Sequence, residues 1–135
     1  MSTTEECPIP EGDLLLRTMA MPKDTNANGD IFGGWIMSQM DIAGGILAKE
    51  VAKGRTVTIA VNQIIFHKPV KVGDVVCCYG QVTKVGNTSV TLELEVWVRP
   101  VLRETEENCP RFKVTEAQFT YVAIDHDGIK RAIPR

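Results

Sequence analysis

One aspartate, Asp41, lies among glycines, alanines and a methionine in a segment with helical periodicity. At about 100° per residue, this periodicity points Asp41 away from the charged face of the helix. Its own face consists of small residues and one methionine: Gly34, Met37, Gly45, Ala48 and Ala52. Position alone is compatible either with a half-exposed helix aspartate or with a chemical role, since a carboxylate buried without a partner is costly and tends to have its proton affinity raised. Asp41 is therefore a candidate general base or nucleophile.

The helix that carries Asp41 is predicted to run from Gly33 to Lys53 and to begin with a pair of glycines, Gly33 and Gly34. The first N–H groups of a helix have no acceptor within it, and the helix dipole favours negative charge there. The Gly33 amide is thus a candidate donor to an oxyanion. A core stripe is expected on another face: Ile36, Met40, Ala43, Leu47 and Val51.

The stretch before this helix matches the first positions of a calcium-binding loop, with Asp24, Asn26, Asn28 and Gly29 correctly spaced. The twelfth position of such a loop should be a bidentate glutamate, and here it is Trp35. We therefore interpret these residues as turns and helix caps and expect no metal. The glycines fit neither a dinucleotide fingerprint nor a phosphate-binding P-loop.

Composition narrows the class of protein. A chain of 135 residues, with 44% hydrophobic and 24% charged residues, fits one globular domain, in which residues 1–12 are expected to be a flexible segment. The net charge of −2 argues against a nucleic-acid partner. There is no apolar run of membrane-spanning length and no signal-like N-terminus, which predicts a cytoplasmic protein.

Four cysteines occur without metal-ligand spacing. Cys77 and Cys78 are neighbours in a strand pattern and should face opposite sides of the sheet. Together with Cys7 and Cys109 they are expected to be reduced thiols, as is usual in a cytoplasmic protein.

The rest of the chain is rich in strand patterns. A first strand is expected within Leu14–Pro22, and Gly86-Asn87 is a hairpin signal. Four long strands are expected after the helix: Thr56–Phe66, Asp74–Val85, Thr88–Val101 and Phe112–Asp125. One long helix with hairpin-ordered strands predicts an α+β domain, in which a curled antiparallel sheet wraps the helix and leaves edges open to other subunits.

The segment from Asp24 to Asp41 (DTNANGDIFGGWIMSQMD), followed by VVCCY at 75–79 and EVWV at 95–98, resembles the YciA-type bacterial acyl-CoA thioesterases of the hotdog superfamily. The resemblance runs from about Leu14 to Pro134. It implies a single hotdog domain that hydrolyses acyl-CoA to the free acid and CoA in fatty acid metabolism. It also implies an assembly of at least a dimer, and of a trimer of dimers (a homohexamer), without a metal or cofactor.

The resemblance further implies residue roles. Asp41 corresponds to the family's catalytic aspartate, Asn26 to an asparagine contributed by the partner subunit, and Gly33 to the glycine whose N–H polarises the thioester carbonyl. The chain departs from its relatives at Asn62, where many of them carry Asp or Glu. Residues at the ends of elements are candidates for contacts with CoA: Gly34, Arg55, Lys68, Lys84, Thr88, Ser89 and Arg131.

Two alternative functions remain open at this stage. A hotdog hydratase or dehydratase would pair a histidine with the acid, but His67 and His126 are interpreted as surface residues. A non-catalytic acyl-CoA-binding module would not need Asp41. Ser38 lacks the Gly-x-Ser-x-Gly context of a nucleophile elbow. The sequence leaves undecided the acyl chain length and whether Asp41 attacks directly or activates water.

Overall fold

The computed structural model describes residues 7–101 and 109–135. One long helix, α1 (Gly33–Ala52), follows strand β1 (Asp13–Met19) and the short 3-10 helix η1 (Pro22–Asp24). Four longer strands come after α1: β2 (Thr56–Phe66), β3 (Val75–Val85), β4 (Ser89–Arg99) and β5 (Phe112–Ala123). The helix α1 and the five strands are the ones predicted from the sequence, with ends that differ by one to two residues from the predicted ends in most cases, whereas η1 was not predicted.

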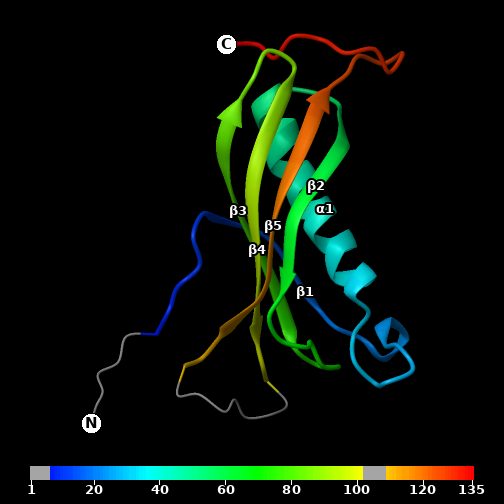
Figure 1. The fold of residues 1–135 in the computed structure, drawn as a ribbon, viewed down its shortest axis with the longest axis vertical. Helices are drawn as coiled ribbons and strands as arrows, with labels where there is room; N and C mark the ends of the chain where they lie inside the picture. Colours follow the sequence, from blue (N-terminus) through cyan, green and yellow to red (C-terminus); the bar gives the residue numbers. More distant parts are fainter. Residues whose placement is uncertain (1–6, 102–108) are drawn as a thin grey trace.

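The five strands form one antiparallel sheet in the order β1-β3-β4-β5-β2. The sheet curls around α1, which crosses one of its faces obliquely, and leaves β1 and β2 as its two edges (Figure 1). The predicted α+β architecture, with a central helix in a curled antiparallel sheet, is confirmed. No helix in the described ranges is long and apolar enough to cross a membrane.

The buried stripe of α1 differs from the predicted one. Ile36, Met40 and Ala43 are buried as expected, but Leu47 and Val51 are only partly covered. Small residues are buried in their place: Ala48 and Ala52, which the sequence places on the face of Asp41, and Gly44, for which it predicts no face. The helix therefore lies closer to the sheet on the side of Asp41, because small side chains permit a close approach there.

The closest approach occurs at Gly44. A Cβ atom at this position would lie 2.4 Å from the hydroxyl oxygen of Tyr121 and 3.0 Å from a methyl group of Leu94. The next glycine, Gly45, has open space around it. Gly44 is therefore required by packing, whereas Gly45 is not.

A disulfide joins Cys7 to Cys109, with 5.6 Å between their Cα atoms, so the expectation of four reduced cysteines is wrong. Sequence spacing could not reveal this pair because 102 positions separate them, and only the fold places the N-terminal segment beside the start of β5. Cys77 and Cys78 are free thiols. Cys78 is buried and Cys77 is half-buried on the other face, as predicted.

We expect Gly44→Ala to destabilise the protein by about 1–3 kcal/mol, since the added methyl group overpacks the contact with Tyr121. Gly45→Ala, one position along the same helix, is the matched control. It should leave stability equal or raise it by up to about 1 kcal/mol through helix propensity. Urea denaturation followed by circular dichroism measures both. Equal effects of the two substitutions would contradict the packing role of Gly44.

Candidate active site

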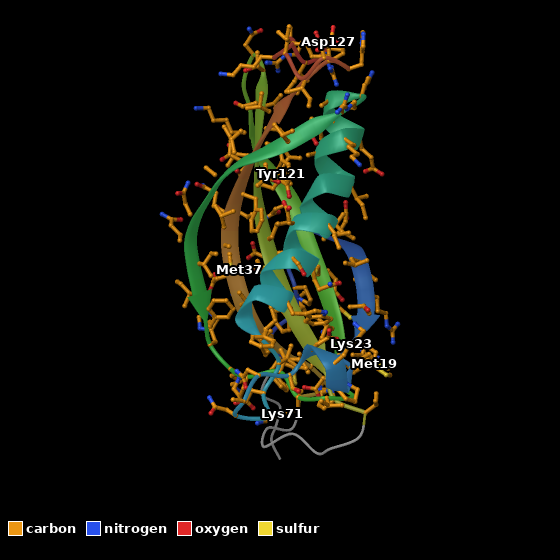
Figure 2. The ribbon with its side chains drawn as sticks, turned by 90° about the vertical axis from the view of Figure 1, so that its right-hand side faces the viewer. Met19, Lys23, Met37, Lys71, Tyr121 and Asp127 are labelled. Atoms are coloured by element: carbon orange, nitrogen blue, oxygen red, sulfur yellow. A yellow bond between two sulfur atoms is a disulfide. The ribbon has the colours of Figure 1, made fainter. Side chains whose placement is uncertain are left out.

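Asp41 lies near the middle of α1, where its side chain meets hydroxyl groups from two strands. Its Oδ1 accepts hydrogen bonds from Thr58 Oγ1 in β2, at 2.5 Å, and from Tyr121 Oη in β5, at 2.9 Å. Tyr121 Oη also lies 3.0 Å from the backbone carbonyl oxygen of Asp41. Figure 2 shows Tyr121 between the sheet and the middle of the helix. The side-chain hydrogen-bond partners of the carboxylate come from the sheet.

The two carboxylate oxygens of Asp41 are therefore unequal. Thr58 and Tyr121 orient Oδ1, whereas Oδ2 makes no hydrogen bond with the described residues of the chain. The side chain is exposed to solvent in the isolated subunit. A carboxylate with one oxygen fixed and the other open is suited to accept a proton from water or to attack a carbonyl carbon.

Tyr121 is suited to the role of a permanent hydrogen-bond donor. It is only 2% exposed. Burial raises the pKa of its hydroxyl far above the ordinary value, and the hydrogen bond with Asp41 raises it further. The hydroxyl therefore keeps its proton near pH 7, and the absence of a side chain at Gly44 lets it reach the helix.

The start of α1 presents unused backbone donors. The amides of Trp35 and Ile36 donate to the Phe32 carbonyl, at 3.1 and 3.2 Å. Within the described residues, the amides of Gly33 and Gly34 have no acceptor. These two N–H groups stand at the positive end of the helix dipole, as predicted, and form a candidate oxyanion-binding position.

The two candidate catalytic groups on α1, the Gly33 amide and the Asp41 carboxylate, lie far apart within one chain. Asp41 follows Gly33 by eight residues, which at about 1.5 Å per residue separates them by roughly 12 Å along the axis. A reacting carbonyl must lie about 3 Å from both its attacking group and its oxyanion donors. Within one subunit, the Gly33 amide and the Asp41 carboxylate therefore cannot act on the same carbonyl.

Asn26 lies in the loop before α1, where its Oδ1 accepts hydrogen bonds from the amides of Asn28, at 2.9 Å, and Asp30, at 3.2 Å. Asp24 likewise accepts from the Met21 amide at 3.2 Å. The interpretation as a turn is confirmed, but α1 has no side-chain cap, because Phe32 occupies that position. The Asn26 NH₂ group makes no hydrogen bond within the described part of the chain, so it is available to donate elsewhere.

The candidate CoA-binding residues divide between the two ends of the molecule. Gly34 and Lys68 lie toward the start of α1, and the Lys68 ammonium stands 5.0 Å above the Phe112 ring. The remaining five lie toward its C-terminal end, roughly 30 Å away: Arg55, Lys84, Thr88, Ser89 and Arg131. One subunit does not bring all seven together.

Arg131, one of these candidates, has a clear structural contact. Its Nη1 donates to the Ala52 carbonyl at the end of α1, at 2.9 Å, and its Nε donates to the Ile124 carbonyl, also at 2.9 Å. The guanidinium thus covers the negative end of the helix dipole. Arg55 stands nearby and donates to the His126 carbonyl at 3.0 Å.

Neither histidine lies at Asp41. His126 is exposed in the turn after β5, and His67 follows β2. His67 Nε2 lies 2.6 Å from Glu116 Oε2, and this hydrogen bond lowers the pKa of Glu116. Glu116 alternates along β5 with the buried Ala117, so the pair lies on the sheet face opposite α1. Among the described residues, the acid–histidine pair that a hydratase would require is absent at Asp41.

Comparison with known proteins places these features in a family context. The family model described as the thioesterase superfamily matches residues 28–103. The chain is 59% identical over 134 residues to an Escherichia coli protein named acyl-CoA thioester hydrolase YciA, covering 99% of this chain and 98% of the relative. It is 62% identical over 125 residues to an uncharacterized acyl-CoA thioester hydrolase from Haemophilus influenzae, covering 93% and 80%.

Solved structures agree with these relatives. A hexameric broad specificity acyl-coenzyme A thioesterase superposes with a TM-score of 0.87 at 60% identity, covering 95% of this chain and 85% of that one. A hexameric thioesterase from Yersinia pestis gives a TM-score of 0.87 at 57% identity, with 94% and 99% covered.

Proposed function

Because the chain belongs to the thioesterase superfamily and is an acyl-CoA thioester hydrolase, we propose that it cleaves its substrate in a site shared by two subunits. In this proposal Asp41 comes from one subunit, and Gly33 and Asn26 come from the partner subunit. The separation of roughly 12 Å between Gly33 and Asp41 along one helix carries the proposal, since only a second copy can bring the two functions together.

The edge strand β2 supports this assembly. Four of its apolar side chains are half exposed or nearly so: Val57, Ile59, Ile65 and Phe66. On α1, Ile42 and Ile46 are 52% and 38% exposed and lie one helical turn apart. An apolar edge strand beside apolar helix residues is typical of a subunit interface. We propose that two copies meet there around a two-fold axis, and that three such dimers form a hexamer.

The proposed reaction uses only groups of the chain and water. The N–H of the partner's Gly33 and the NH₂ of the partner's Asn26 donate to the thioester carbonyl oxygen and stabilise the negative charge that develops on it. Asp41 Oδ2 either removes a proton from an attacking water or attacks the carbonyl carbon itself. In the first route the C–S bond breaks, Asp41 returns the proton to the leaving sulfur, and the products are the acid and the CoA thiol. In the second route the CoA thiolate leaves and a mixed anhydride remains on Asp41; one water then hydrolyses the anhydride, which releases the acid, regenerates the carboxylate and supplies the proton that the thiolate takes up. Single-turnover hydrolysis in oxygen-18 water distinguishes the two routes, because only water attack on the aspartyl carbonyl of the anhydride places the label in the Asp41 carboxylate.

Hydrolysis of a thioester changes no oxidation state, and we propose that the reaction needs neither a metal nor a cofactor. Coenzyme A takes part only as a portion of the substrate. The cluster of Arg55, Lys84, Thr88 and Ser89 is our proposed contact for the CoA nucleotide. We also propose a role in cytoplasmic fatty acid metabolism, where reducing conditions would open the Cys7–Cys109 disulfide.

Asp41→Asn should lower kcat by at least about a hundredfold while leaving the fold intact. The amide oxygen of asparagine still accepts the hydrogen bonds of Thr58 and Tyr121, so the loss reports chemistry rather than packing. Thiol release from acyl-CoA measures the rate, and thermal unfolding provides the control. A variant that retains near-normal turnover would rule out Asp41 as the reacting carboxylate.

Tyr121→Phe and Thr58→Val each remove one hydrogen bond that orients Asp41, and each should lower kcat about tenfold or more with a small change in KM. A hydrogen bond to a charged group is worth about 1.5–3 kcal/mol, which sets this magnitude. Thr120→Val is the matched control, because Thr120 neighbours Tyr121 in β5 but faces the other side of the sheet. If all three variants behave alike, the two hydroxyls do not position the carboxylate.

The substitution Asn26→Asp tests whether the NH₂ group of the partner's Asn26 donates to the thioester carbonyl oxygen. Aspartate still accepts the hydrogen bonds of the Asn28 and Asp30 amides, so the loop should persist, but it has no NH₂ group to donate. We expect this variant to be nearly inactive and as stable as the wild-type protein. Asn26→Ala, which also removes the turn, should be inactive and less stable.

Mixing Asn26→Asp subunits with Asp41→Asn subunits tests whether the site is shared. After exchange through a dissociating condition, random pairing should restore roughly a quarter of wild-type activity, because half of the dimers then hold one intact site. Mass spectrometry under native conditions verifies that mixed dimers have formed. Mixed dimers without activity would show that each site is built within one chain.

A further inference from the structure

The sheet face that points away from α1 carries three arginines around a small cavity. Strand pairing sets Arg17, Cys77 and Trp97 side by side in one row across β1, β3 and β4. Arg99 at the end of β4 and Arg111 just before β5 complete the rim. The cavity has a volume of ≈ 70 Å³, and its lining also includes Leu14, Tyr79 and Val98.

The positive charge of this cluster is not neutralised by acidic side chains in the described part of the chain. None of the three arginines forms an ion pair there. Glu95 lies on the same face, but its carboxylate accepts hydrogen bonds from Trp97 Nε1, at 2.9 Å, and from the Glu11 amide, at 3.2 Å. It also pairs with Lys113 at 3.7 Å. Glu95 is therefore committed to other partners.

Cys77 does not supply a negative charge either. Burial raises the pKa of its thiol, and this effect outweighs the opposing influence of Arg17, Arg99 and Arg111. The thiol therefore stays neutral near pH 7. The three guanidinium groups and this thiol line the same small cavity.

The lining of the cavity is partly fixed before any ligand binds. Arg111 Nη1 lies 3.4 Å from the Tyr79 hydroxyl, and the guanidinium stands 6.0 Å from the centre of the Trp97 ring. Trp97 is only 3% exposed and is held by its bond to Glu95. A pre-formed site loses less conformational entropy when it binds a ligand.

We propose that this cavity binds a phosphate group at a site separate from Asp41. Planar guanidinium groups match the oxygens of phosphate and can bind them in a bidentate manner. At roughly 10–15 Å³ for each water-sized position, the cavity holds about five to seven such positions, which is enough for the five heavy atoms of one phosphate. The group comes either from inorganic phosphate or from a phosphate of coenzyme A.

Titration calorimetry of inorganic phosphate into the assembled protein tests the site directly. The double variant Arg17→Gln/Arg99→Gln should raise the Kd for phosphate at least tenfold. Its matched control is Lys49→Gln/Lys130→Gln, which removes the same charge from exposed positions outside the cavity and should change the Kd by less than twofold. The absence of saturable binding by the wild-type protein, or equal weakening in both double variants, would overturn the proposal.

Alkylation of Cys77 locates the bound phosphate independently of calorimetry. Phosphate should slow the reaction of Cys77 with iodoacetamide in the wild-type protein but not in the Arg17→Gln/Arg99→Gln variant. Cys78 is buried and serves as the internal unreactive reference. Unchanged alkylation in the presence of saturating phosphate would mean that the anion binds elsewhere, which overturns the proposal.

The same alkylation experiment with coenzyme A, and with dephospho-coenzyme A, which lacks the 3′-phosphate, identifies the source of the bound phosphate. Protection of Cys77 by coenzyme A that disappears with the dephospho compound assigns the site to the coenzyme. Protection by inorganic phosphate alone assigns it to the free anion. Both results support a phosphate site, and because the readout is protection of a thiol, it does not depend on the hydrolytic mechanism.

Discussion

The hydroxyl of Tyr121 contacts both the carboxylate and the backbone carbonyl of Asp41, and this contact joins the sheet to the helix at the reactive group. It exists only because position 44 carries no side chain, so that β5 and α1 approach within contact distance. The same approach rotates the buried stripe of α1 toward small residues. Gly44 therefore permits both the close packing of the helix and the hydrogen bond by which Tyr121 orients the carboxylate.

The geometry of α1 constrains the distance between its candidate catalytic groups. A helix of 20 residues holds its N-terminal amides and its mid-helix carboxylate at a fixed separation. Bending the helix would break its own hydrogen bonds, so the shared site that we propose takes its two groups from two copies of the chain. In that proposal the exposed apolar side chains of β2, the strand that also carries Thr58, form the contact between the subunits. The proposed interface and the proposed catalytic carboxylate therefore lie next to each other.

Much of the fold could be predicted from local pattern. The 3.6-residue period of α1 and the alternation in β4 each specify an element, and the free amides at Gly33 follow from any helix start. Thr58 and Tyr121 could not be predicted as partners of Asp41, because they lie 17 and 80 residues from it and meet it only after the sheet has curled. The shifted core stripe was missed for the same reason: which face of a helix is buried depends on what packs against it.

The disulfide between Cys7 and Cys109 closes most of the chain into a covalent ring. The ring contains β1, α1, β2, β3 and β4, whereas β5 lies outside it in the sequence but inside the sheet. Closing a ring of about 100 residues restricts the unfolded chain by an amount worth up to about 4.7 kcal/mol in the chain-entropy model. A protease that cuts within the ring would leave both pieces tethered, so an oxidised molecule can survive a nick that would separate the halves of a reduced one. The redox state of its surroundings thus sets how long a damaged copy of this protein stays whole.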